Sequence, residues 1–398
     1  MVTRALRWVV LLASITLLGV VAVPELRAIS RRPATTAVDL LPVWCQSRIL
    51  VYGDAACDPT VISAIFRKPV GPARDTSSAY YYPPTAALLL LPTAALPFEL
   101  VARGFRWFSA LALLAAAGLV VTAVPVRDRV LGATGVALLG AGVFSLRVVR
   151  GSLLAGQTGP VLVGLTAAAL WAIGRERPRF GGVITAVGIA LKLFPGLVLL
   201  SLLRRRAGWP WVLGTLALLV GVTFLFPHHA TPFGWLGGAL EFVDRPMRGA
   251  WSHEPGWVIA LWRGRFVGLG IPTAAAVAFA VRRARSARAE VALAFLLVGW
   301  GGTVMAGSPQ THEGLVLLPA VLWVLAWPLQ SGPRLVSALA ATLLGVVMWD
   351  LGVMSAMAPP NSLHWVPIGY LAWVGCLLRW GWALQERRDT AAPTSGSG

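Results

Sequence analysis

The sequence WVVLLASITLLGVVAV, residues 8–23, contains no charged residue and follows two arginines, Arg4 and Arg7. A helix that crosses the hydrocarbon core of a membrane needs about 20 mostly apolar residues, and basic residues beside it favour the cytoplasmic side. No clean small-residue cleavage site follows the run, which favours a retained anchor over a cleaved signal peptide. We therefore expect the first transmembrane helix here, with the N-terminus in the cytoplasm.

The rest of the chain has the same apolar character. Of its 398 residues, 57% are hydrophobic and 13% are charged, whereas charged residues make up about 25% of an ordinary soluble domain. So much apolar surface cannot be buried inside one soluble core. The net charge of +18 does not indicate a nucleic-acid partner, because the arginines form short clusters between apolar runs, as in cytoplasmic loops. The composition predicts a polytopic membrane protein that is surrounded by membrane lipids.

The basic clusters set the expected orientation. We assign the four strongest to the cytoplasm: residues 175–179, 204–206, 282–288 and 387–388. Residues 180–203 lie between two of these clusters but provide only enough length for one crossing. We expect a re-entrant hairpin there that turns near Lys192, because Pro195 breaks the helix. Residues 84–102 are interrupted by Pro92 and Pro97 and are expected to form a second re-entrant or interfacial segment.

These assignments predict an all-α membrane protein with about ten crossings and both termini in the cytoplasm. The predicted crossings are residues 8–23, 107–126, 130–147, 159–174, 209–226, 266–281, 290–306, 314–330, 335–352 and 363–382. They form one transmembrane domain, residues 1–386, with long extracytoplasmic loops at 24–83 and 227–265 and a disordered cytoplasmic tail at 387–398. Cys45 and Cys57 fall in the first loop, where the two thiols can stay free or form a disulfide in an oxidising compartment.

Lys192 is the most unusual ionisable residue. It lies in the apolar sequence AVGIALKLFP, residues 186–195. Of the 34 lysine and arginine residues in the chain, Lys68 is the only other lysine. Ionisable groups at membrane depth are costly and usually face an internal cavity or a partner. A lysine supplies a compact ammonium, which indicates a functional role; the alternative is a lysine that reaches to the membrane interface.

The first loop contributes a carboxylate and a pair of tyrosines. Asp39 lies near the start of the loop, where a carboxylate can act as a general base toward an acceptor hydroxyl or help to hold a cation. A divalent metal therefore stays an option, although no cofactor is indicated and the cysteines and histidines lack metal-ligand spacing. Tyr81 and Tyr82 close the loop and are either substrate-binding residues or interface anchors.

Polar residues also occur in a connection expected on the outer side. Arg147 and Arg150 precede a Gly-Gln pair that contains Gln157. Two arginines at the outer face run against the positive-inside trend and suit an anionic partner such as a lipid phosphate. Gln157 is a candidate substrate-binding residue beside them.

A later turn, residues 307–314, separates two apolar runs. It contains Gln310, His312 and Glu313, which we take as candidate substrate-binding residues. The alternative is a hydrogen-bonded turn with a purely structural role.

Five segments follow one another along the chain: Asp39; YPPTAALLLLP at residues 82–92; Gly156 and Gln157; Gly182 and Gly188 followed by Lys192 and Pro195; and Ser308 and Pro309 followed by His312. In this order they resemble bacterial integral-membrane glycosyltransferases of the GT-C type, and in particular glycosyltransferase family 87. That family includes polyprenol-phosphate-mannose-dependent mannosyltransferases.

The resemblance implies a GT-C-like helix bundle in the inner (plasma) membrane with an extracytoplasmic active site. It implies that a sugar, expected to be mannose, passes with inversion from a polyprenyl-phosphate donor to an envelope lipid or glycan acceptor. Asp39 would be the base, and Lys192, Arg147 and Arg150 would bind the donor phosphate.

Two other functions fit the composition. A transporter or lipid flippase also uses broken helices with a charged residue near the midplane, although no internal repeat is evident. A catalytically inactive member of an envelope-assembly complex is the third option.

Overall fold

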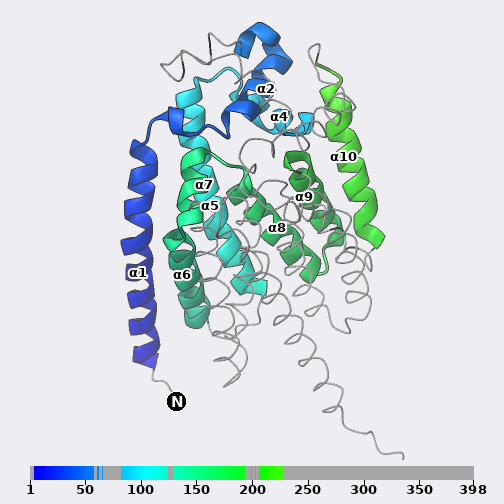
Figure 1. Cartoon of the computed structure of the whole chain (residues 1–398). Helices are drawn as coiled ribbons and strands as arrows, with labels where there is room; N and C mark the ends of the chain where they lie inside the picture. The colour runs from blue at the N-terminus through cyan, green and yellow to red at the C-terminus, as the bar shows by residue number, and fades with distance from the viewer. Residues whose placement is uncertain are drawn as a thin grey trace, which may run out of the picture.

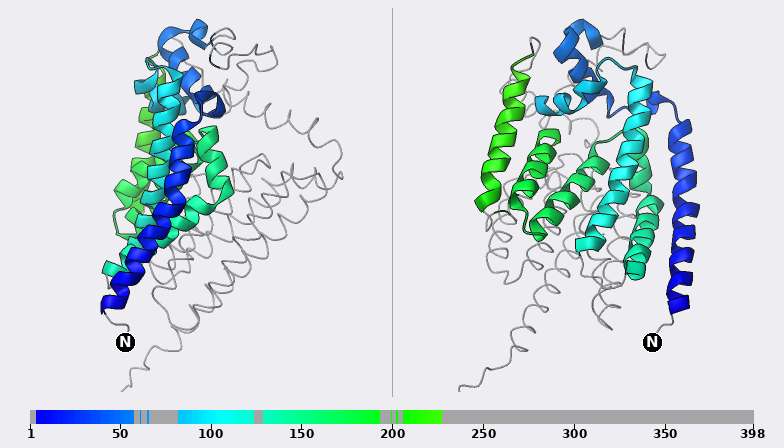
Figure 2. Two further views of the ribbon diagram at one scale, coloured as in Figure 1. Left: turned by 90° about the vertical axis from the view of Figure 1, so that its left-hand side faces the viewer. Right: turned by 180° about the vertical axis from the view of Figure 1, so that it is seen from behind.

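The structure is a computed structural model that describes residues 4–57, 61, 65, 82–123, 129–192, 199, 202 and 206–226. This part of the chain contains helices and no strand, in agreement with the predicted all-α fold. Neighbouring long helices pack in the order α1, α6, α5, α8, α9 and α10. Helices α1 and α10 lie at opposite edges of this arrangement (Figures 1 and 2). The second loop, the tail and every predicted crossing after residue 226 lie outside the described residues.

Helix α1 spans Arg4–Arg31 and is longer than predicted. The helix continues through Pro24, the residue at which the first loop was predicted to begin. Ala22 and Ile29 are both buried in the main hydrophobic core, so packing stabilises the helix on both sides of the proline. Such prolines are tolerated in membrane helices when neighbouring helices support the chain.

Helix α5, Phe98–Ala123, begins earlier than the predicted start at residue 107. Residues 98–102 therefore belong to this long helix and not to the interfacial segment. The residues before it form the short helix α4, Pro84–Leu90, and the 3-10 turn η5, Leu91–Thr93. Helix α4 lies at the same end of the bundle as α2, Leu41–Tyr52 (Figure 1). Segment 84–97 thus contains only short elements, and its re-entrant or interfacial position stays a prediction.

Two of the described helices are long and apolar enough to cross a membrane, Ala5–Arg31 and Phe98–Thr122. A third crossing results if α6, Arg129–Ser145, and the following helical residues Val149–Ala155 cross together despite a bend of 68°. Helix α8 spans Gly159–Gly174, which matches the predicted boundaries. The total of ten crossings stays a prediction, since it depends on residues beyond the described ranges.

Helix α9, Pro178–Leu191, ends directly before Lys192. Helix α10, Trp209–Thr223, follows the short turn η7, Arg206–Gly208. A Cβ atom added to Gly182 would lie 2.5 Å from the carbonyl oxygen of Gly208, and one added to Gly208 would lie 2.9 Å from that of Pro178. Gly208 therefore lies beside the beginning of α9, whereas Lys192 follows its end. The re-entrant hairpin at residues 180–203 stays a prediction, since most residues between Lys192 and Arg206 lie outside the described ranges.

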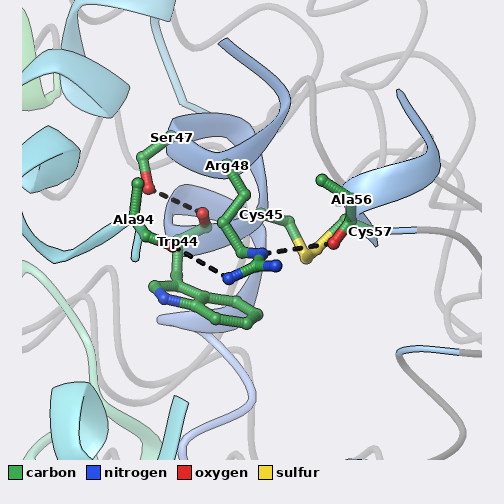
Figure 3. The surroundings of a disulfide bond; sticks show 7 residues. All are labelled: Trp44, Cys45, Ser47, Arg48, Ala56, Cys57 and Ala94. Atoms are coloured by element: carbon green, nitrogen blue, oxygen red, sulfur yellow. Dashed lines mark hydrogen bonds between the residues drawn. A yellow bond between two sulfur atoms is a disulfide. The ribbon is translucent and has the colours of Figure 1, made fainter. Parts of the chain in front are cut away.

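Residues 32–57, the described part of the first predicted loop after α1, are structured. They contain the turn η1, Ala34–Thr36, then α2 and the turn η2, Asp54–Cys57. A disulfide joins Cys45 to Cys57, with 5.5 Å between their Cα atoms (Figure 3). Arg48 donates from Nε to the carbonyl oxygen of Ala56 at 3.2 Å and from Nη1 to that of Ala94 at 2.9 Å. The disulfide and Arg48 thus hold α2, η2 and the turn after α4 together.

Candidate functional site

Asp39 and Gln157, two of the residues singled out in the sequence, are direct partners. Nε2 of Gln157 donates a hydrogen bond of 2.8 Å to Oδ2 of Asp39. The backbone N–H of Asp39 also donates to the carbonyl oxygen of Ala155 at 3.0 Å. An ionised carboxylate only accepts hydrogen bonds, so the amide group must present its NH₂ side to Asp39. These contacts fix the orientation of the carboxylate.

A glycine makes this pairing possible. Helix α7, Arg147–Ala155, ends at Gly156, which has φ 68° and ψ 36°. Only glycine adopts this left-handed conformation without a steric cost. A Cβ atom on Gly156 would also lie 3.0 Å from the Cβ atoms of both Ala37 and Leu40. Since the turn packs closely against the segment around Asp39, the next residue, Gln157, reaches the carboxylate.

Tyr82 and Lys192 approach the same region through one hydrophobic cluster. Buried Tyr82 packs in a cluster with Leu191 and with Val161 and Leu162 of α8. Val161 and Leu162 lie in the first turn of α8, directly after the Gly-Gln turn. Lys192 follows Leu191 and is half-buried. The structure therefore brings Tyr82 and Lys192 to the end of the bundle that carries Asp39 and Gln157.

A hydrogen bond connects two of the elements in this region. The hydroxyl of Thr85, near the start of α4, donates to the carbonyl oxygen of Ala190 at 2.8 Å. It joins the segment that carries Tyr82 to the end of α9, and Lys192 follows two residues after Ala190.

Arg150 has a different partner. Its Nε atom lies 3.1 Å from Oε2 of Glu25 in α1. No hydrogen bond or ion pair within the described ranges joins Arg150 to Asp39 or Gln157. The other predicted side chains lie outside the described residues: Arg147, whose backbone begins α7, Tyr81, Gln310, His312 and Glu313. In the ranges that the structure describes, no group of three or more His, Cys, Asp and Glu residues is placed to hold a metal ion.

Arg106 of α5 is a polar residue that the sequence analysis missed. Only 1% of its surface is exposed. It donates hydrogen bonds to the segment before Asp39 and to the end of α7, before Gln157. An arginine beside an apolar run was the signal in the sequence, because ionisable groups in such a place usually face a partner or an internal cavity.

The sequence profile of glycosyltransferase family 87 matches residues 80–309, more than half of the chain. The chain belongs to glycosyltransferase family 87. The resemblance inferred from the short motifs is thereby confirmed. The matched range contains Tyr82, Gln157 and Lys192, whereas Asp39 precedes it.

The chain is also similar to a curated family relative. This is the polyprenol-phosphate-mannose-dependent alpha-(1-2)-phosphatidylinositol pentamannoside mannosyltransferase of Mycolicibacterium smegmatis (strain ATCC 700084 / mc(2)155). The two sequences are 27% identical over 261 residues, which is 58% of this chain and 60% of the relative. The similarity thus spans less than two thirds of the relative's length. No solved structure matches the chain.

Proposed function

We propose that this family 87 protein transfers mannose from a polyprenyl-phosphate donor to a lipid or glycan acceptor of the cell envelope. The reaction would take place at the extracytoplasmic face of the plasma membrane. Family membership supports sugar transfer, and the donor class follows the name of the mycobacterial relative. The observation that carries the proposal is the hydrogen bond between Gln157 and Asp39. It fixes a carboxylate beside the family-matched part of the chain.

Asp39 acts as the general base. Gln157 holds Oδ2, which leaves Oδ1 to accept the proton of the acceptor hydroxyl. The acceptor oxygen forms a bond to the anomeric carbon of mannose, and the bond between that carbon and the donor phosphate oxygen breaks. Attack from the face opposite the phosphate inverts the configuration of the anomeric carbon.

Lys192 stabilises the leaving group. The broken bond leaves its electron pair on the polyprenyl phosphate, so negative charge grows on the phosphate in the transition state. An ammonium group in a site with little water stabilises such a charge strongly. Lys192 directly follows the buried Leu191 in the cluster that contains Tyr82, which supports this assignment.

The remaining predicted residues have secondary roles in the proposal. Arg147 and Arg150 bind the donor phosphate as it enters. Tyr82 lines the site, while Tyr81, Gln310, His312 and Glu313 contact the substrates.

The test uses the purified full-length protein in vesicles with radiolabelled polyprenyl-phosphate-mannose and an envelope lipid extract. Wild-type protein should form a labelled glycolipid, and Asp39→Asn should reduce the rate at least ~100-fold. Glu99→Gln is the matched control, since Glu99 is an exposed carboxylate at the start of α5 that pairs with Arg103 at 3.3 Å. Transport of the donor without a covalent product would instead identify a carrier. Equal rates for wild type and Asp39→Asn would disprove the assigned base.

A further inference from the structure

Arg106 is buried and fully surrounded by protein groups. Its Nη1 atom donates to the carbonyl oxygen of Arg32 at 3.1 Å. Its Nη2 atom donates to three acceptors, the carbonyl oxygen of Pro33 at 3.3 Å, the hydroxyl of Thr36 at 2.6 Å and the carbonyl oxygen of Leu154 at 2.9 Å. One guanidinium group therefore joins two segments that are far apart in the sequence.

The burial of this charge requires an explanation. Taking an ion out of water is costly unless it is paired, yet no carboxylate in the described part of the chain pairs with Arg106. Its neighbour one turn earlier, Arg103, is exposed and forms an ordinary surface pair with Glu99. The carbonyl and hydroxyl acceptors are thus what stabilises the buried guanidinium of Arg106.

The two joined segments are those that carry the proposed base and its partner. Thr36 lies three residues before Asp39, and Leu154 lies three residues before Gln157. Beyond the guanidinium, the same segments meet again through the hydrogen bond from the N–H of Asp39 to Ala155. Arg106 therefore binds both segments next to the contact that places the Gln157 amide against the Asp39 carboxylate.

We propose that Arg106 is the positioning residue of the Asp39–Gln157 pair, and this inference rests on the proposed function. A displacement of about 1 Å in a catalytic group can cost ~100-fold in rate. A guanidinium has a rigid, planar set of five donors, whereas an ammonium is a compact point charge. Lysine at this position would keep the charge and lose the simultaneous contact with both segments.

The main variant is therefore Arg106→Lys, with Arg103→Lys as the matched control on the exposed side of α5. We expect Arg106→Lys to lower kcat about 10- to 100-fold while KM for the donor stays within about twofold, because the donor phosphate lies at Lys192. Arg103→Lys should leave both values unchanged. A second variant, Thr36→Val, removes the 2.6 Å hydrogen bond from Arg106 and the 2.9 Å bond that the Thr36 hydroxyl donates to the carbonyl oxygen of Pro33. It keeps the other contacts of Arg106 and should lower kcat less, in case Arg106→Lys does not fold.

Coupling to Gln157 separates positioning from a general structural role. Interacting residues give non-additive effects in double-mutant cycles. Combined with Gln157→Leu, the Arg106→Lys change should have little further effect on kcat. Additive losses in this cycle would overturn the proposal.

Hydrogen exchange gives a readout that does not depend on activity. The amide of Asp39 should exchange faster in Arg106→Lys or Thr36→Val, because its bond to Ala155 is loosened, while the α8 amides keep their protection. Unchanged protection together with wild-type kcat in Arg106→Lys would also overturn the proposal. Failure of the proposed function can be distinguished from failure of this inference, because Asp39→Asn would then keep full activity whether or not Arg106 is changed.

Discussion

The hydroxyl of Thr85 donates to the carbonyl oxygen of Ala190, at 2.8 Å and across 105 positions of sequence. Both groups are buried, so this bond links α4 to the last turn of α9 and helps to place Lys192 near Tyr82. A neutral hydrogen bond of this kind contributes about 1 kcal/mol to stability. If Lys192 stabilises the leaving group as proposed, the larger importance of this bond lies in the position of Lys192.

Replacement of Thr85 by valine should weaken donor binding. The variant keeps the shape of the side chain but leaves the Ala190 carbonyl without this donor, so we expect KM for the donor to rise several-fold. Thr122→Val is the control, since the exposed Thr122 hydroxyl bonds only to Leu119 of its own helix. Steady-state kinetics in vesicles measure KM for the donor in both variants. An unchanged KM in Thr85→Val would contradict the proposed placement of Lys192.

Lys192→Gln should abolish most of the sugar transfer. Loss of one group that stabilises transition-state charge costs about 100- to 1,000-fold in kcat. Arg179→Gln, at the exposed opposite end of α9, removes a positive charge from the same helix and should have little effect. Equal activities of the two variants would refute the role of Lys192.

Gly156→Ala should destabilise the protein and reduce transfer together. A non-glycine residue in the left-handed region costs about 1–3 kcal/mol, and the new Cβ would lie 3.0 Å from those of Ala37 and Leu40. Gly151→Ala is the control, because a Cβ at Gly151 of the same helix meets nothing within 4 Å. Thermal unfolding in detergent should show a lower Tm for Gly156→Ala alone.

The Glu25–Arg150 pair separates two roles for Arg150. The side chains are 23% and 48% exposed, so as an ion pair they contribute only about 0.2–1 kcal/mol. If Arg150 binds the donor phosphate as proposed, Arg150→Gln should raise KM for the donor more than Glu25→Gln does. Identical small effects of the two changes on KM would indicate that Arg150 only links α1 to α7.

Reduction of the Cys45–Cys57 disulfide should lower stability. The bond closes a short loop of sequence separation 12, for which chain-entropy estimates give about 3 kcal/mol. The double variant Cys45→Ser, Cys57→Ser should have a lower Tm that no longer responds to reductant. A wild-type Tm that is insensitive to complete reduction would contradict this expectation.

Apolar runs predicted helices well where the sequence is uniformly apolar. Helix α8 has the predicted boundaries, because residues 159–174 contain no ionised group. The start of α5 was misplaced because Arg103 and Arg106 interrupt the apolar run. Hydropathy treats both arginines as polar surface, whereas Arg106 is buried by acceptors from other segments.

The residues of the candidate site could be predicted from the sequence, but the contacts between them could not. Asp39 and Gln157 were each noticed as polar residues beside apolar runs. Their hydrogen bond depends on Gly156 and on the packing of α7 against the segment after α1. A contact between residues 118 positions apart cannot be read from one sequence, because only the tertiary fold creates it.

The Cys45–Cys57 bond also has a consequence for biogenesis. Cytosolic reductants keep thiols reduced, so we expect the pair to close only after this part of the nascent chain has been exported. Asp39 lies six positions before Cys45, so the two residues would be exported in the same segment of the chain. Fixation of η2 on α2, the helix that follows Asp39, would then wait for thiol oxidation outside the cytosol.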